Sequence, residues 1–332
     1  MEMKNKIKRI RISGPFMIFV AMVVLFSILS RRFFTFSNAA NIIRQASVLA
    51  LAAFGQTFAI LLAGIDLSIG AVMGLTSCTA AVLMVGGMSP MVALVIALLV
   101  ALVCGLINGF VTNYIGLNPF VSTFGMWGMA LGVALIITEE RVIYGFPDTL
   151  RVFNDGVLFG VIPVPLIIVL LVWWVLHFFL KKTAGGIATY AIGGNEEAAA
   201  LSGISVKLQK MLLYGLSGLM AGFAGIMFLS RANAAQAIDT IGYEFDSICA
   251  VVLGGTSLAG GKGGVKQTLL GVVLFATMRN GMNMIGINMY LQLVFIGVIL
   301  IAAYIAESRK KTKPVPVETS ELEGDRKTGE AQ

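Results

Sequence analysis

Apolar runs of membrane-spanning length recur along almost the whole chain, and no other feature limits its possible folds as strongly. A helix needs roughly 20 predominantly apolar residues to cross the hydrocarbon core of a bilayer. Such runs occupy residues 14–30, 41–63, 67–86, 90–111, 119–138, 158–180, 209–229, 245–259, 267–284 and 288–306. The run 245–259 is short and ends in glycines, which also fits a broken or re-entrant helix. The sequence therefore predicts an all-α, polytopic membrane protein with about ten transmembrane helices.

The charge content agrees with a chain that is embedded along most of its length. Charged residues make up 12% of the 332 residues and hydrophobic ones 58%, whereas a soluble domain usually carries about 25% charged residues. We predict one transmembrane domain over 14–306 in the lipid bilayer. Residues 1–13 form a basic N-terminus, and residues 307–332 a polar tail that we predict to be disordered. Nucleic acid is excluded as a partner, because no basic cluster falls on a folded face.

Basic residues predict the orientation of the chain. Basic clusters beside apolar spans usually stay on the cytoplasmic side. Both ends are basic, and an even number of spans places both termini in the cytoplasm. The loop 181–208, which carries lysines near both of its ends, is then cytoplasmic, and the acidic loop 139–157 is external. Arg31 and Arg32 oppose the rule, because they fall on the predicted outer side.

Glycine is abundant, and much of it lies within the spans. Small residues four positions apart let helices approach closely where the hydrophobic effect cannot drive their association. Such pairs occur at Gly70/Gly74, Gly105/Gly109, Gly128/Gly132 and Gly218/Gly222. The pattern indicates a densely packed bundle.

Asp66 is the only acidic residue between Glu2 and Glu139, and two roles are open for it. An ionisable side chain between two apolar spans is costly and points to a functional site on a translocation pathway. Alternatively, Asp66 caps the following helix by accepting backbone N–H bonds, and Ser68 could share that task. We favour the cap, at a turn that can still matter for transport.

A second polar stretch, LNPFVSTFG, begins the span 119–138. Asn118 is expected to cap this helix, with Pro119 at its first position. Asn118, Ser122 and Thr123 either face a polar pathway or hydrogen-bond neighbouring helices, and we favour the second.

The predicted cytoplasmic loop contains GGNEEAAALSG. Asn195 is a good N-cap, Glu196 and Glu197 suit the positive first turn, and Gly203 can end the helix. A helix of about two turns is predicted here. It either connects two spans or serves as a docking point for a cytoplasmic partner.

The stretch GGTSLAGGKGG does not form a phosphate-binding loop. That motif needs a glycine, four residues and then Gly-Lys followed by Ser or Thr, whereas Thr256 stands six residues before Lys262 and a glycine follows it. No nucleophile–base pair or metal-ligand cluster occurs. Cys78, Cys104 and Cys249 lie far apart in apolar stretches and are expected to be buried free thiols. We therefore predict no catalytic residue, no metal site, no nucleotide site and no bound cofactor in this chain.

Five motifs in a fixed order carry a family resemblance. They are AGIDLSIGAVMGL, GLNPFVSTFGMWG, YAIGGNEEAAALSGI, GYEFDSICAVVLGGTSLAGGKGG and NGMNMIGI. With them, residues 33–306 resemble the permease subunits of bacterial ABC importers for ribose and related monosaccharides, in the branched-chain amino acid/sugar permease superfamily. The resemblance implies a location in the bacterial inner membrane and a fold similar to the membrane subunit of the cobalamin importer.

The same resemblance implies several partners. Two permease chains, identical or related, would form a central pathway. A cytoplasmic ABC ATPase would bind ATP and Mg and dock on the inner side, and a periplasmic or extracellular sugar-binding protein would deliver the substrate. The coupling segment would comprise Gly193, Gly194, Asn195, Glu196, Glu197, Ala198, Leu201, Ser202 and Gly203. The family often has arginine where this chain has Gly186 and Ala200, so its coupling surface is less basic.

The sequence thus predicts the permease of an ATP-driven importer that moves a monosaccharide such as ribose by alternating access. Because the spans carry almost no acidic residue apart from Asp66, the pathway suits a neutral sugar. An autoinducer sugar, a nucleoside or a branched-chain amino acid stays open as the substrate. An ion-coupled secondary transporter is the rival of another class, and it would need an intramembrane relay of ionisable groups.

Overall fold

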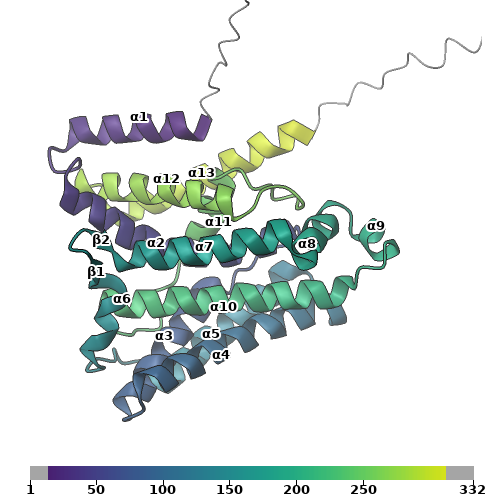
Figure 1. Ribbon diagram of the computed structural model, residues 1–332, viewed down its shortest axis with the longest axis horizontal. Coiled ribbons are helices and arrows are strands. Elements are labelled where there is room, and N and C mark those ends of the chain that lie inside the picture. Colours follow the sequence, from purple (N-terminus) through teal and green to yellow (C-terminus); the bar gives the residue numbers. More distant parts are fainter. Residues whose placement is uncertain (1–13, 312–332) are drawn as a thin grey trace, which may run out of the picture.

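Helices make up most of residues 14–311, the part of the chain that the computed structural model describes. The long helices are α1 (Gly14–Leu29), α2 (Phe36–Leu61), α3 (Ile69–Val85), α4 (Pro90–Phe110), α5 (Pro119–Thr138), α7 (Val164–Lys182), α10 (Val206–Ala232), α12 (Val265–Met284) and α13 (Met289–Lys311). The shorter elements are the π-helix η1 (Val111–Ile115), the 3₁₀-helix η2 (Asp148–Arg151), α6 (Val152–Asp155), β1 (Val157–Leu158), β2 (Ile162–Pro163), α8 (Ala184–Gly194), α9 (Glu196–Leu201) and α11 (Tyr243–Leu253). Figure 1 shows α1, α12 and α13 on one side of the bundle, α3, α4 and α5 on the other, and α2, α7 and α10 between them.

Each predicted apolar run overlaps one of these helices, which supports a polytopic membrane protein. Within the described residues, five helices are long and apolar enough to cross a membrane by length and composition: α2, α4 continued by η1, α5, α7 and α10. The predicted run 245–259 is not helical to its end, because α11 stops at Leu253. Its 11 residues would span only about 16 Å, against a hydrocarbon core of about 30 Å.

The two predicted terminal segments fall largely outside the described residues. This applies to the basic N-terminus 1–13 and to residues 312–332 of the tail. The start of the tail differs from the prediction, because α13 continues as a helix to Lys311.

The centre of the bundle is α10, which packs against α2, α3 and α4. Glycines make its contact with α4 close: a Cβ on Gly218 would overlap the carbonyl oxygen of Ala101 and lie 2.8 Å from the Cα of Gly105. A Cβ on Gly109 would likewise lie 2.6 Å from the Cα of Met211. These backbones approach as the glycine spacing predicts. The pair Gly128/Gly132 on α5 differs, because a Cβ there would meet nothing within 4 Å.

The glycines of α3 pack against a non-helical stretch instead of against another helix. A Cβ on Gly74 would lie 2.7 Å from the carbonyl oxygen of Ala237, and one on Gly70 would lie 2.8 Å from that of Thr240. Ala237 and Thr240 are buried. Residues 233–242 therefore enter the bundle along α3 before α11 begins, which explains why α11 is short.

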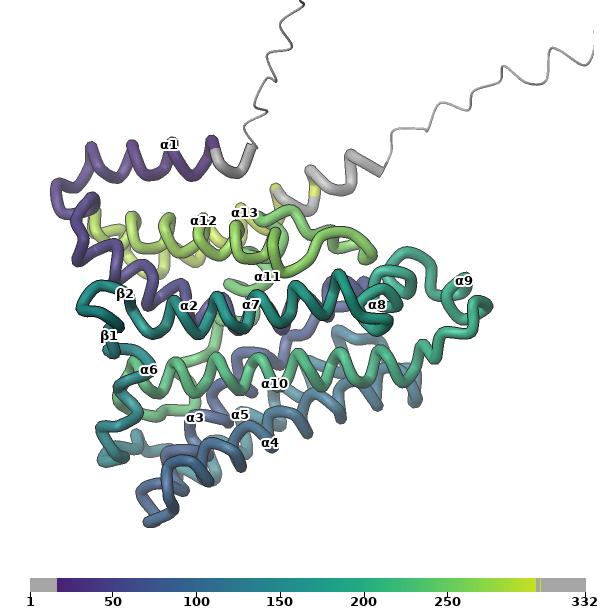
Figure 2. The backbone as a smooth tube through the Cα atoms, viewed as in Figure 1, coloured from purple at the N-terminus to yellow at the C-terminus, as the bar shows by residue number. Residues whose placement is uncertain are grey.

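Two groups of contacts mark the opposite ends of the bundle. At one end, the backbone N–H of Gly261 donates to the carbonyl oxygen of Leu61 (3.0 Å). At the other, Ile143 and Ala235 form a bridge, and the Ser230 hydroxyl donates to the Leu150 carbonyl (2.6 Å). Along the tube in Figure 2, α8 and α9 lie at the first end, and β1 and β2 lie at the second.

The close contact between α10 and α4 yields a stability prediction. Gly218→Ala should destabilise the protein by about 1–3 kcal/mol, because the added methyl group overpacks the contact with α4. The midpoint of thermal unfolding in detergent measures the effect. Gly128→Ala is the matched control, since the open site should leave the midpoint unchanged. Equal midpoints for the two variants would contradict the packing role.

Candidate functional site

A short helix projects from one end of the bundle. The α9 helix begins after Asn195, whose Oδ1 accepts from the Ala198 backbone N–H (2.9 Å). Glu196 and Glu197 lie in its first turn, and Gly203, with φ of +83°, follows its end. Figure 1 shows α9 beyond the ends of α7 and α10. The predicted two-turn helix in this loop is confirmed.

The sequence did not predict α8, the helix that carries α9. Its sequence AGGIATYAIGG contains four glycines, which have low helix propensity. The Thr183 hydroxyl caps it by accepting from the Gly186 backbone N–H (3.1 Å). A Cβ on Gly186 would overlap the carbonyl oxygen of Phe179. The tight turn from α7 into α8 thus leaves no room for a side chain at this position.

The end of α8 is wedged against two other segments. A Cβ on Gly193 would overlap the Leu61 carbonyl oxygen and lie 2.6 Å from the nitrogen of Gly261. The Tyr190 hydroxyl donates to the Gly263 carbonyl (2.9 Å). The segment that carries α9 therefore touches both the end of α2 and the glycine-rich loop before α12.

A groove of about 700 Å³ lies between α9, η1 and the start of α10. It is lined by Tyr114, Glu196, Glu197, Ala200, Ile204, Ser205, Val206, Lys207 and Leu208. The Nζ of Lys210 donates to Oε2 of Glu196 in an ion pair of 2.9 Å. Leu201, in the last turn of α9, is 91% exposed. Of the predicted coupling residues, 195–203 thus form one protruding element with a partly apolar groove beside it, whereas Gly193 is packed at the end of α8.

Asp66 is fully buried where four helices meet. Its Oδ1 accepts from the backbone N–H (3.0 Å) and the hydroxyl (2.6 Å) of Ser68, and its Oδ2 accepts from the Ser217 hydroxyl of α10 (2.8 Å). With the Gln56 amide of α2 turned to the orientation that satisfies both of its groups, its nitrogen donates to the Asp66 carbonyl (2.9 Å) and its oxygen accepts from the Asp66 backbone N–H (3.2 Å). Asn108 of α4 donates to the Ser68 hydroxyl (2.9 Å). These bonds offset the cost of burying a carboxyl group.

The expected cap by Asp66 is correct only in part, because Asp66 accepts the backbone N–H of Ser68, which lies before the first residue of α3. The residue before α3 is Ser68, whose side chain makes no capping bond. Asp66 instead holds the turn itself and ties it to α10. Sequence reasoning missed Gln56, Asn108 and Ser217, because their partners lie far away in the chain.

The other predicted pathway residues separate into two groups. The hydroxyl of Thr123 accepts from the Leu67 backbone N–H (3.1 Å), so Thr123 joins the Asp66 turn. Ser122 is buried. Asn118 is exposed and accepts from the Phe120 backbone N–H (2.9 Å) as the predicted cap of α5.

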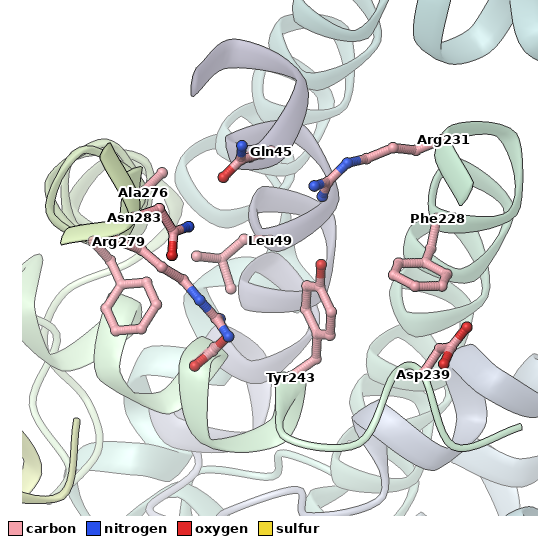
Figure 3. A pocket seen from close by; sticks show the side chains of 11 residues that line it. Gln45, Leu49, Phe228, Arg231, Asp239, Tyr243, Ala276, Arg279 and Asn283 are labelled. Carbon is pink, nitrogen blue, oxygen red and sulfur yellow. The ribbon is translucent and has the colours of Figure 1, made fainter. Parts of the chain in front are cut away.

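A polar cavity of about 270 Å³ lies among α2, α10, α11 and α12. It is lined by Gln45, Leu49, Phe228, Arg231, Asp239, Tyr243, Asp246, Phe275, Ala276, Arg279 and Asn283 (Figure 3). Asp246 is buried and forms an ion pair with the half-buried Arg279. Arg231 and Asp239 have no ion-pair partner within 4.0 Å in the part of the chain that the structure describes.

These charges correct the expectation that Asp66 is almost alone among the spans. Glu244 and Asp246 of α11 are both buried, at the start of a segment that the sequence places in the membrane. The clue was available, since GYEFDSI overlaps the start of the weakest apolar run, but nothing local ties Asp246 to Arg279.

The cysteines and possible metal ligands give no further site. Cys78, Cys104 and Cys249 are buried free thiols, as predicted. Over residues 14–311, no group of three or more His, Cys, Asp or Glu residues is placed to hold a metal ion.

Comparison with known proteins adds a consistent set of similarities. The sequence model of the family described as "Branched-chain amino acid transport system / permease component" matches residues 38–304. The chain is 41% identical to the ribose import permease protein RbsC of Bacillus subtilis, over 90% of this chain and 92% of that protein. It is 38% identical to the D-allose transport system permease protein AlsC of Escherichia coli, over 87% and 89%. It is 32% identical to the L-arabinose transport system permease protein AraH of Escherichia coli, over 90% and 90%. No solved structure matches.

The ion pair in the cavity gives a second stability prediction. Asp246→Asn should destabilise the protein by about 1–3 kcal/mol, because it leaves the half-buried Arg279 without its charged partner. Adding Arg279→Met should recover much of that loss, as measured by thermal unfolding in detergent. Glu139→Gln, which breaks the exposed pair with Arg141, is the control and should have no effect. A double variant as unstable as the single one would contradict the pairing.

Proposed function

Because the chain belongs to the family of branched-chain amino acid transport system permease components, we propose that it is the membrane-spanning subunit of an ATP-driven monosaccharide importer. The relatives named for ribose, D-allose and L-arabinose support a neutral aldose as the substrate, with ribose the first to test. Ten spans in a fold like that of the cobalamin importer's membrane subunit form part of the proposal.

Charge placement supports a cytoplasmic location for the α9 end and for both termini. Lysines gather there, at the end of α7, at the start of α10 and around the start of α12: Lys181, Lys182, Lys207, Lys210, Lys262 and Lys266. The opposite end carries Glu139, Glu140, Asp148 and Asp155. Cytoplasmic loops of inner-membrane proteins carry an excess of lysine and arginine, and the arginines Arg141 and Arg151 at the opposite end are offset by Glu139 and Asp155.

The observation that carries the proposal is the projecting α9 with its groove at this lysine-rich end. A cytoplasmic ABC ATPase would dock on α9 and bind ATP and Mg itself, while the permease has no nucleotide site of its own. An external sugar-binding protein would deliver substrate at the opposite end. A second permease chain, identical or related, would complete the pathway, which alternates its access as the ATPase moves α9.

Uptake in reconstituted vesicles tests the proposal. Labelled ribose should enter only when ATP, the ATPase and the sugar-binding protein are all present, and a non-hydrolysable ATP analogue should give no uptake. D-allose, L-arabinose, a nucleoside and L-leucine identify the substrate class. Uptake driven by an ion gradient alone would favour the ion-coupled alternative, for which the buried Asp66 and Asp246 are the candidate relay groups.

The docking role of α9 predicts the effect of removing its acidic turn. Changing Glu196 and Glu197 together to alanine should lower uptake at least about tenfold, because the ATPase loses charge-assisted contacts. Alanine preserves the helix, so the permease should still fold.

The ion pair between Glu196 and Lys210 supplies the control. Lys210→Gln breaks this pair without altering α9, and it should leave coupling close to wild type. Sugar uptake and stimulated ATP hydrolysis that are unchanged in the Glu196/Glu197 variant would overturn the docking role.

A further inference from the structure

Three backbone segments meet directly at the α9 end of the bundle: the end of α2, the end of α8 and the loop 254–264. The backbone N–H of Gly261 donates to the Leu61 carbonyl (3.0 Å). A Cβ on Gly261 would lie 2.8 Å from the nitrogen of Gly194, and one on Gly193 would overlap the Leu61 carbonyl oxygen. This close approach leaves no room for a side chain, and we call Leu61, Gly193 and Gly261 the backbone junction. In Figure 2, the loop between α11 and α12 lies beside α8.

On one side, a single residue joins the backbone junction to α9. Asn195 ends α8, where its backbone N–H donates to the Ala191 carbonyl (3.0 Å). The same residue caps α9, where its Oδ1 accepts from the Ala198 backbone N–H (2.9 Å). The two helices therefore share Asn195, with no linker between them, and a displacement of α9 acts directly on Gly193.

On its other side, the backbone junction borders the turn that holds Asp66. Leu61 is the last residue of α2, and Ala63 follows with φ of +59°, a left-handed conformation that is uncommon for residues other than glycine. A Cβ on Gly260 would lie 3.0 Å from the Ala63 nitrogen. The loop 254–264 thus packs against the strained start of the turn 62–68, whose Asp66 is bonded to Ser217 of α10.

A buried hydroxyl beside this turn is left without a partner. A Cβ on Gly64 would overlap the hydroxyl oxygen of Tyr214, so the two residues touch. Tyr214 of α10 is 1% exposed, and its hydroxyl has no hydrogen-bond partner in the part of the chain that the structure describes. An unpaired buried hydroxyl costs free energy. A shift of the turn that pairs this group would recover that cost, so the turn is suited to a second arrangement.

Hydrogen bonds give the loop 254–264 a defined shape and tie it to α8. The backbone N–H of Ser257 donates to the Lys262 carbonyl (3.0 Å). The Tyr190 hydroxyl of α8 donates to the Gly263 carbonyl (2.9 Å). Closely packed protein is hardly compressible and transmits strain. Such a loop passes a displacement on instead of absorbing it.

We propose that the backbone junction transmits the displacement of α9 to the Asp66 turn, which makes Gly193 and Gly261 positioning residues for transport. The inference rests on the proposed function, in which an ATPase moves α9. Backbones in direct contact move together, whereas an intervening layer of side chains could yield by changing rotamers. From the turn, the displacement reaches α10 through Ser217 and α5 through Thr123, whose hydroxyl accepts from the backbone of the turn.

The amount of sugar imported per ATP hydrolysed, measured with the complete importer in vesicles, tests the inference. Tyr190→Phe keeps the aromatic ring and removes the hydrogen bond from α8 to the loop. Sugar imported per ATP should fall about threefold or more, while stimulated ATP hydrolysis persists because α9 is unaltered. Tyr144→Phe, which changes an exposed tyrosine at the opposite end, is the matched control and should keep the wild-type ratio.

A second variant changes the backbone junction itself. Gly261 has φ of +67°, and in Gly261→Ala the added methyl group would meet Gly194. Sugar imported per ATP should fall about tenfold or more, because the contact between the loop and α8 is forced apart. Gly255 lies in the same loop with φ of +96°, but a Cβ there would meet nothing within 4 Å. Gly255→Ala therefore adds backbone strain without this contact, and it should keep the wild-type ratio.

Failure of this inference is distinguishable from failure of the proposed function. If the wild type imports sugar, but Tyr190→Phe and Gly261→Ala keep its ratio of sugar to ATP, the backbone junction transmits nothing and the importer function stands. Equal losses of uptake and ATP hydrolysis in Tyr190→Phe would make the contact structural and overturn the inference. If Gly261→Ala does not fold, the ratio in Tyr190→Phe decides. A wild type that takes up no monosaccharide with ATP and both partners would overturn both.

Discussion

Hydrocarbon offers no hydrogen bond to a peptide group, and in residues 14–311 non-helical stretches enter the helical bundle or close its end. Residues 62–68 are held by Asp66, through the Gln56 amide and the Ser217 hydroxyl. Residues 233–242 lie in the glycine groove of α3. The loop 254–264 bonds to the end of α2 and to Tyr190 of α8. Each stretch is possible only because a glycine or a buried polar side chain makes room for it or pairs with it.

These same stretches connect the two candidate sites. The α9 helix follows α8, whose Gly193 touches Gly261 in the loop 254–264. That loop leads back into α11, which supplies Tyr243 and Asp246 to the polar cavity. A continuous set of packed segments therefore runs from the docking element to the cavity. The short α11 is its central part, and its 11 residues leave it free of the constraint to cross the whole membrane.

Periodic and terminal features of the sequence predicted the helices well, because length, apolarity and capping are local properties. Asn118 and Asn195 both cap helices as their sequences indicate. The α8 helix was missed because packing rather than propensity favours its glycines: Gly186 lies against the end of α7, and Gly193 lies against Leu61 and Gly261. The partners of Asp66 and Asp246 were missed for a related reason. Ser217 and Arg279 are single residues in apolar helices, and only the three-dimensional packing brings them to their carboxylates.

Paired charges make polar groups tolerable in the segment that the sequence places in the membrane. An unpaired charge would be costly there. Asp246 and Arg279 avoid that cost, because each offsets the charge of the other. The partner for the buried carboxylate of α11 comes from α12, 33 residues later in the chain. The short α11 can therefore carry a carboxylate into the bundle only because α12 packs beside it with a guanidinium at the matching level.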